Sequence, residues 1–181
     1  IYWGNRNWDP FIGDTATQMV ADGVTNALAF VTSAFSSYSG CRQYRQDMSQ
    51  AADGVDGALT FHKIRAFWNH PGFIETMVDR VSDALNELSA DDRPTARLVF
   101  TAHSIPISMA TTSDYVAQLT DAATLISQAV GHADFDLVYQ SRSGPPQVPW
   151  LEPDICDHLR SVAGSAIVLI PLGFISDHQE V

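Results

Sequence analysis

Apolar residues along the chain fall into two kinds of segment, and the two kinds alternate. Short, mostly apolar runs occupy residues 26–35, 97–102, 135–139 and 166–174. Such runs lack polar alternation, as expected of strands covered on both faces of a sheet. Residues 73–88 and 115–130 instead carry apolar side chains at spacings of three and four, which indicates amphipathic helices. A further helix is expected at about 154–162. This alternation predicts an α/β fold with open parallel sheets flanked by helices.

Local signals suggest where the smaller elements begin and end. Residues 1–3 and 64–68 are candidate strands, and residues 46–60 are expected to form a helical turn and a loop. Thr15 and Gln18 fit a capping box at the start of a short helix, and Ser113 can cap the helix that follows it.

Composition narrows the classes of function. The net charge of −11 argues against a nucleic-acid or anionic-membrane partner, because phosphate binding needs basic residues. The longest apolar run, residues 166–174, is shorter than the roughly 20 residues of a membrane-spanning helix. Cys41 and Cys156 form no CxxC pair, so a reducing compartment is the simpler assumption, and they cannot complete a metal site within this chain.

Candidate chemistry lies where the predicted strands end. His103 directly follows the run 97–102, Gln140 follows 135–139, and the run 166–174 leads to Asp177, His178 and Glu180. In open parallel sheets the ligand site lies beyond the carboxyl ends of the strands. An imidazole there can accept a proton near neutral pH or bind a metal, and a carboxylate can assist it.

Each of these residues also has a purely structural interpretation. His103 could be a core histidine that is satisfied by a backbone carbonyl. Asp177 could be the N-cap of a helix with Glu180 as its partner three residues later. Arg42 and Arg45, beside Tyr38 and Tyr44, could hold a planar anionic ligand or could form a solvated rim.

Four segments of the chain together carry a resemblance to a known family. They are Tyr-Ser-Gly-Cys-Arg-Gln-Tyr-Arg at 38–45, Thr-Ala-His-Ser-Ile-Pro at 101–106, residues 139–151, and Pro-Leu-Gly-Phe-Ile-Ser-Asp-His-Gln-Glu at 171–180. On these segments the chain resembles the ferrochelatase family over essentially its whole length. The segment around Cys41 is most similar to the actinobacterial type.

The resemblance implies an internal fragment of a two-domain protein built of Rossmann-like halves. Residues 1–60 would be the C-terminal part of the first chelatase domain, and residues 61–181 most of the second. The implied function is insertion of ferrous iron into a porphyrin in haem biosynthesis, in the cytoplasm. Coproporphyrin III is the favoured substrate and protoporphyrin IX the other candidate.

The resemblance also implies roles for individual residues. His103 would bind the metal and accept pyrrole protons, with Glu180 as its partner across the macrocycle. Tyr44 would contact the porphyrin, and Asp177 and His178 would line the path of the metal. The chemistry needs no organic cofactor. Cys41 matches the first ligand of the [2Fe–2S] cluster that some members carry, and the other ligands would lie outside this chain.

Two other functions stay open at this stage. One is a cobalt or nickel chelatase of the same fold. The other is a non-catalytic module that binds a metal or a tetrapyrrole, with His103 and Glu180 as a storage site. Porphyrin and Fe²⁺ are the expected partners, with no nucleic acid and no membrane span, and the sequence does not identify protein partners.

Overall fold

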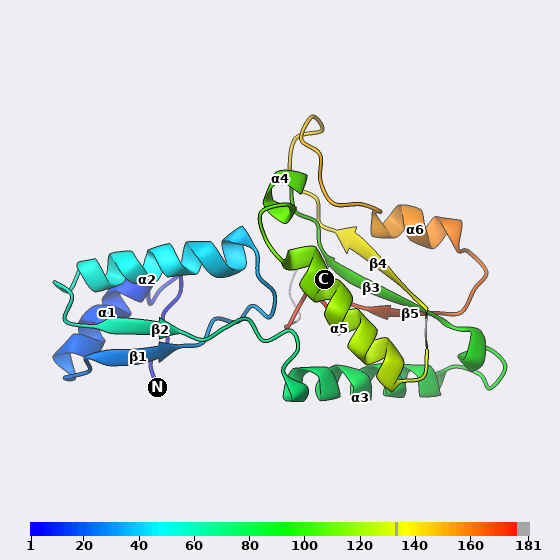
Figure 1. The fold of residues 1–181 in the computed structure, drawn as a ribbon, viewed down its shortest axis with the longest axis horizontal. Coiled ribbons are helices and arrows are strands. Elements are labelled where there is room, and N and C mark those ends of the chain that lie inside the picture. The colour runs from blue at the N-terminus through cyan, green and yellow to red at the C-terminus, as the bar shows by residue number, and fades with distance from the viewer. Residues whose placement is uncertain (133, 177–181) are drawn as a thin grey trace. The chain divides into compact units, whose positions relative to one another are not determined.

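The computed structural model describes residues 1–132 and 134–176. The chain folds into two compact units. The first comprises Ile1–Ser33 and Ser37–Ala66, and the second comprises Ala34–Ser36 and the residues from Phe67 onward. Each unit contains a parallel sheet with helices packed against it (Figure 1). The predicted class, α/β with open parallel sheets flanked by helices, is therefore confirmed.

The first unit is built around a pair of parallel strands. Strand β1 (Asn26–Ala29) pairs with β2 (Thr60–Lys63), and helices α1 (Ile12–Ala21) and α2 (Gln43–Asp53) pack against each other beside them (Figure 1). The buried apolar residues at the centre of this unit are Ala16, Ala51 and Leu59. A short π-helix, Tyr38–Arg42, leads directly into α2.

Several boundaries in the first unit differ from the sequence predictions. The expected strand at residues 26–35 ends at Ala29, and the strand expected at 64–68 lies instead at Thr60–Lys63. Leu28, on β1, is 79% exposed, so the expectation of a strand covered on both faces is wrong for β1. Apolar composition alone therefore did not identify which run would be enclosed.

The start of α1 also differs from its prediction. The helix begins at Ile12 rather than at Thr15, and its N-cap residue, Phe11, makes no side-chain capping bond. The Thr15 hydroxyl donates to the carbonyl of Phe11, four residues earlier, at 3.0 Å. Threonine inside a helix often bonds backward in this way, so a threonine followed by glutamine does not by itself mark a helix start.

The second unit contains a three-stranded parallel sheet with its longest strand in the middle. The strand order is β4 (Phe135–Gln140), β3 (Arg97–His103) and β5 (Ile167–Ile170). The pairing of β3 with β4 runs to the last residue of both strands, where His103 lies opposite Gln140.

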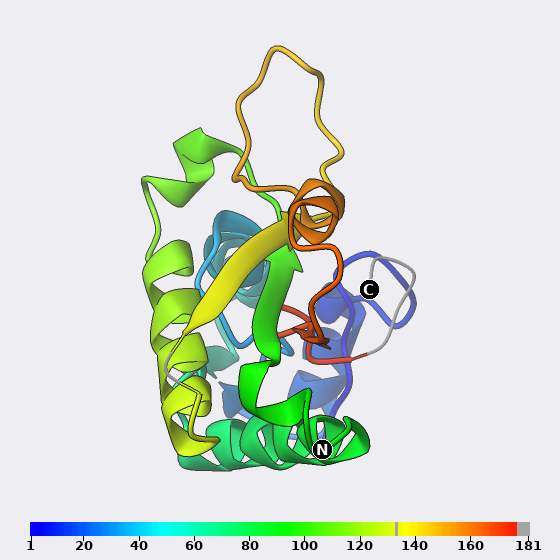
Figure 2. The same ribbon diagram turned by 90° about the vertical axis from the view of Figure 1, so that its right-hand side faces the viewer.

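Helices cover both faces of this sheet. Helices α3 (Pro71–Glu87) and α5 (Tyr115–Ala129) pack together, and α5 contacts β4 while α3 contacts β5. Helix α6 (Ile155–Ser161) contacts β4 and lies on the other side of the strands from α5 (Figure 2). The remaining helices of the described part of this unit are a 3₁₀ turn, Arg93–Thr95, and a single turn, α4 (Ile107–Ala110).

Strand β3 is enclosed on both faces. Leu98, Phe100 and Ala102 point into the core that α3 and α5 share. Val99 and Thr101, which point the opposite way, are also no more than 1% exposed. This burial explains why the run reads as apolar without alternation, and it confirms that part of the prediction.

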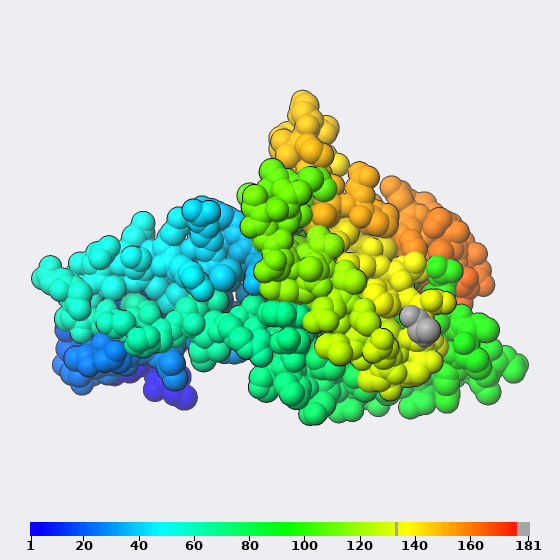
Figure 3. Space-filling model, viewed as in Figure 1, coloured from blue at the N-terminus to red at the C-terminus, as the bar shows by residue number. Residues whose placement is uncertain are grey.

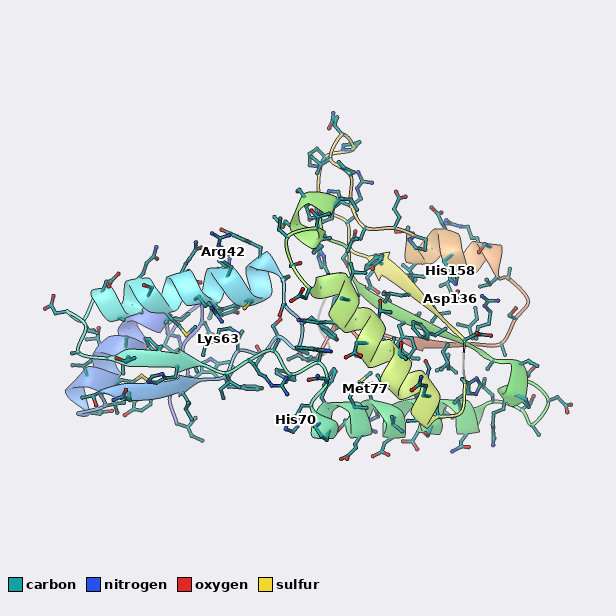
Figure 4. The ribbon with its side chains drawn as sticks, viewed as in Figure 1. Arg42, Lys63, His70, Met77, Asp136 and His158 are labelled. Carbon is teal, nitrogen blue, oxygen red and sulfur yellow. The ribbon has the colours of Figure 1, made fainter. Side chains whose placement is uncertain are left out.

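An ionic cluster joins three elements at the amino-terminal edge of this sheet. The Asp136 carboxylate lies 2.8 Å from Arg97 Nη2 and 3.3 Å from His158 Nε2 (Figure 4). These residues belong to β4, β3 and α6, so the cluster brings one side chain of α6 against the first residues of two strands. It lies at the edge of the sheet opposite to His103.

No helix in the described part of the chain is both long enough and apolar enough to cross a bilayer.

Gly173 provides a test of the packing beside His103. A Cβ at this position would lie 2.5 Å from Ala102 Cβ and 2.7 Å from Ala102 Cα, with backbone that cannot move aside. We expect Gly173→Ala to lower the free energy of unfolding by about 2 kcal/mol, the usual cost of overpacking. Urea denaturation followed by far-ultraviolet circular dichroism measures the change.

Gly13 in α1 is the matched control. A Cβ there meets no atom within 4 Å, so Gly13→Ala should leave the stability unchanged or raise it by up to about 1 kcal/mol. Equal unfolding midpoints for the two variants would contradict the close approach at Gly173.

Candidate functional site

The candidate site in the second unit is the carboxyl-terminal edge of its sheet. His103 ends β3, and Gln140, its partner in register, ends β4. After β5, the Gly173 N–H donates to the Thr101 carbonyl at 3.0 Å, which brings the chain that follows β5 alongside the end of β3. The prediction that these strand ends share one edge is therefore confirmed for His103 and Gln140.

A hydrogen bond to the main chain sets the proton position on the His103 ring. Nδ1 lies 2.5 Å from the carbonyl oxygen of Ser104, the next residue, and the imidazole is half-buried. A carbonyl oxygen can only accept, so Nδ1 carries the proton in the neutral ring. Nε2 then carries the lone pair and is the nitrogen that can accept a proton or bind a metal.

The backbone that carries this ring is fixed on three sides. The Ser104 N–H donates to the Gln140 carbonyl at 2.7 Å, and the Ser104 hydroxyl donates to the Leu151 carbonyl at 2.9 Å. The third bond comes from α5, where the Tyr115 hydroxyl donates to the His103 carbonyl at 3.1 Å.

The loops after β3 and β4 also pair with each other. The Leu151 N–H donates to the Ile105 carbonyl, and Ile107 N–H to the Pro149 carbonyl, both at 3.0 Å. Beyond this pairing, the residues between β4 and Trp150 protrude from the surface of the second unit (Figure 3). Within that loop the Trp150 ring lies so close to Gly144 that any larger residue there would displace it. The pairing joins the two loops that follow the His103 end of the sheet.

Tyr115 was missed by the sequence analysis, which placed it on the apolar face of a helix. It is 6% exposed, and the Phe35 ring packs edge-on against it at 6.4 Å. Burial and, to a smaller extent, the nearby Tyr139 raise its pKa, so its hydroxyl stays a neutral donor well into the alkaline range. Nothing in the helical periodicity separates a tyrosine that packs from one that also donates a hydrogen bond.

Gln118, one turn further along α5, was also missed, because a polar residue does not contribute to an apolar periodicity. Its amide pairs with Ser36 twice, accepting from the Ser36 N–H at 2.7 Å and donating to the Ser36 hydroxyl at 3.0 Å. The same face of α5 therefore holds both the His103 strand end and the segment Ala34–Ser36. That segment continues directly into the π-helix that carries Cys41.

The candidate residues at the end of the chain cannot be tested in the same way. Asp177, His178 and Glu180 lie outside the described residues. Their predicted roles, and the pairing of Glu180 with His103, stay predictions.

Tyr44 lies in the first turn of α2, in the first unit. It borders a cavity of about 200 Å³ together with Arg6 and Met48. The Arg6 guanidinium carbon lies 5.7 Å from the Tyr44 ring centroid, and Arg6 Nε lies 3.3 Å from the Asp47 carboxylate. This ion pair and cation–π contact hold Arg6 and Tyr44 side by side, next to an opening that is partly apolar.

Cys41 lies in the π-helix Tyr38–Arg42 and is half-buried. The Ser37 hydroxyl caps this turn by accepting from the Gly40 N–H at 3.0 Å. Cys156, the other cysteine, is exposed on α6. Among residues 1–132 and 134–176, no three His, Cys, Asp or Glu side chains come together in a way that could hold a metal ion. The described residues therefore do not by themselves form a site for the predicted cluster, and the role of Cys41 stays a prediction.

Gln118 offers a test of how α5 holds the neighbouring segment. In Gln118→Leu the part-buried Ser36 N–H loses its acceptor, which costs about 2 kcal/mol of unfolding free energy. Chemical denaturation measures the loss. Gln128→Leu, an exposed position on the same helix, is the control and should change the stability by less than about 0.5 kcal/mol. A Gln118→Leu protein as stable as the control would show that the Ser36 contact contributes little.

Comparison with known proteins places the whole chain within one family. The family model described as Ferrochelatase matches residues 1–181. The chain is 52% identical over 186 residues to a protein named Ferrochelatase from Rhodopirellula baltica, covering 100% of this chain and 53% of that protein. It is 51% identical over 193 residues to Coproporphyrin III ferrochelatase from Nocardia farcinica, covering 100% of this chain and 55% of that protein. The chain is also 49% identical over 194 residues to a protein of the same name from Corynebacterium glutamicum, of which it covers 52%. The chain thus spans about half the length of these curated relatives.

Proposed function

Because the chain belongs to the ferrochelatase family, we propose that the complete protein inserts ferrous iron into a porphyrin during haem biosynthesis. The observation that carries the proposal is His103 at the carboxyl end of β3, with its Nδ1 proton bonded to the Ser104 carbonyl. The names of the relatives support it. Because the chain spans about half of those relatives, the activity is proposed for the complete protein rather than for these 181 residues.

The proposed reaction exchanges two pyrrole protons for one metal ion. The porphyrin loses the protons of two inner N–H groups and Fe²⁺ takes their place, so the net charge of the macrocycle core does not change. His103 Nε2 accepts the two pyrrole protons one after the other and passes each to water, since Nδ1 already carries a proton, and Glu180 is proposed as its partner across the macrocycle.

Coproporphyrin III is the favoured substrate, as the names of the Nocardia and Corynebacterium relatives suggest for those proteins. Its four propionates need cationic partners in a chain whose net charge is −11. Arg42 and Arg45 are the candidates, because both are exposed in the first unit, Arg42 at the end of the π-helix and Arg45 in the first turn of α2. Tyr44 is proposed to contact the porphyrin from there.

Further parts of the proposal rest on the family resemblance. Asp177 and His178 are proposed to line the metal path. Cys41 is proposed as one ligand of a [2Fe–2S] cluster that thiolates outside this chain complete. The cytoplasmic location is proposed on the same ground. So is the assignment of residues 1–60 to the C-terminal part of a first chelatase domain and of residues 61–181 to most of a second.

His103→Gln tests the proposed base. We expect the full-length variant to lose iron insertion by at least about a hundredfold, the usual effect of removing a general base, while still binding the porphyrin. The assay follows the absorption spectrum of coproporphyrin III, and separately of protoporphyrin IX, with Fe²⁺ under anaerobic conditions. His62→Gln is the control, since His62 is exposed in the first unit and the amide can keep its contact with Asn26.

Three outcomes would contradict the proposal. Unchanged turnover in His103→Gln would remove His103 from the mechanism. Insertion of Co²⁺ or Ni²⁺ but not Fe²⁺ by the unmodified protein would favour a different chelatase. Tight porphyrin binding without any insertion would favour a non-catalytic binding module.

A further inference from the structure

We propose that Tyr115 is a positioning residue for His103, which it orients through the peptide group that joins His103 to Ser104. This inference deepens the proposed function and rests on it. The hydroxyl of Tyr115 donates to the His103 carbonyl at 3.1 Å, and the N–H of the same peptide group donates to the Gln140 carbonyl at 2.7 Å. One peptide plane is thus held at both ends, by a helix on one side and by a strand on the other.

The orientation of this peptide plane determines where the imidazole can lie. The ring makes its Nδ1 hydrogen bond to the Ser104 carbonyl, which is attached to the residue on the far side of that plane. If the His103 carbonyl were released, the plane could rotate about its flanking bonds, and the Ser104 carbonyl would move with it. The ring would then lose the acceptor that keeps the proton on Nδ1 and the lone pair on Nε2.

Tyr115 is suited to this task because it cannot easily move. It is 6% exposed on a fifteen-residue helix whose inward residues include the fully buried Leu119 and Ile126. The edge-on contact with Phe35 fixes the plane of its ring. Burial also raises its pKa, so the hydroxyl keeps its proton and stays a donor.

Gln140 by itself would constrain the peptide less. Its carbonyl is part of the sheet ladder and fixes the strand direction, but a single bond at the N–H end leaves rotation about the axis of that bond. The bond from Tyr115 reaches the opposite end of the same group and adds a second anchor, beside the bond from the Ser104 hydroxyl to the Leu151 carbonyl. Tyr115 of α5 and Gln140 of the sheet therefore bind the same peptide group at its two ends.

Tyr115→Phe in the full-length protein tests the inference. The change keeps the buried ring and removes only the hydroxyl. We expect the kcat for iron insertion to fall about five- to tenfold, the equivalent of one hydrogen bond, while the KM for porphyrin stays within about twofold. The control is Thr120→Val, which removes an exposed hydroxyl bonded to the Val116 carbonyl on the same helix and should match the unmodified protein.

A second readout does not depend on activity. The ring ¹⁵N chemical shifts of His103, identified by their loss in His103→Gln, should show the Nδ1–H tautomer in the unmodified protein. Tyr115→Phe should give averaged shifts from both tautomers, while Thr120→Val keeps the original pattern. A purely structural hydroxyl would lower stability without changing these shifts.

The two hypotheses fail in distinguishable ways. If the unmodified protein inserts no metal, the proposed function fails, and the His103 ring shifts still decide the role of Tyr115. If the unmodified protein is active and Tyr115→Phe keeps both its kcat and its tautomer pattern, the positioning role is overturned. Equal losses in Tyr115→Phe and Thr120→Val would overturn it as well.

Discussion

The constraint on which the second unit depends is the complete enclosure of β3. This strand pairs on both edges and is covered on both faces, and residues 98–102 are no more than 1% exposed. A parallel strand buried in this way cannot slip in register without exposing apolar side chains or losing ladder hydrogen bonds. Its last residue, His103, therefore lies at a defined point at the edge of the sheet.

The same enclosure explains which parts of the fold could be predicted. The run at β3 was recognisable because burial on two faces removes polar alternation, and the spacing of apolar residues located α3 and α5. The runs at β4 and β5 were recognised from their apolar composition, although Leu169 on β5 is 46% exposed. The alternation of these elements then implied parallel pairing and placed His103 and Gln140 at one edge. Composition and burial therefore agree at β3, whereas the expected strand at 166–174 is confined to Ile167–Ile170 and is not covered on both faces.

The first unit shows where such reasoning fails. The run at 26–35 has similar composition, yet only Asn26–Ala29 is a strand, and Leu28 lies largely exposed. Thr15 matched a capping motif but bonds back within a helix that had already begun. Short motifs report what a side chain can do locally, whereas tertiary contacts decide which of those options is used.

Tyr115 and Gln118 were unpredictable for a different reason. Periodicity classifies a side chain by the face it lies on, and both residues do lie on the inward face of α5. It says nothing of the polar atom at the tip, whose partner is known only once the fold brings α5 against the strand end and the segment at Ser36. The position of His103 could thus be derived from the sequence, but the contacts that orient it could not.

A buried hydroxyl also links the core of the unit to its candidate chemistry. Burying the Tyr115 oxygen is unfavourable unless it finds an acceptor, and the acceptor it finds is the main chain of His103. Packing of α5 and orientation of the imidazole are therefore coupled through one contact.

Loops beyond strand ends are usually the variable part of an α/β fold, since they lack the ladder that orders the strands. Here three contacts extend that order past the end of β3. They are the hydrogen bond from the Tyr115 hydroxyl of α5, the bond from the Ser104 hydroxyl to Leu151, and the pairing of the two loops. The position of the His103 imidazole, the base of the proposed reaction, is thus set by this extension of the ordered main chain as well as by the side-chain rotamer.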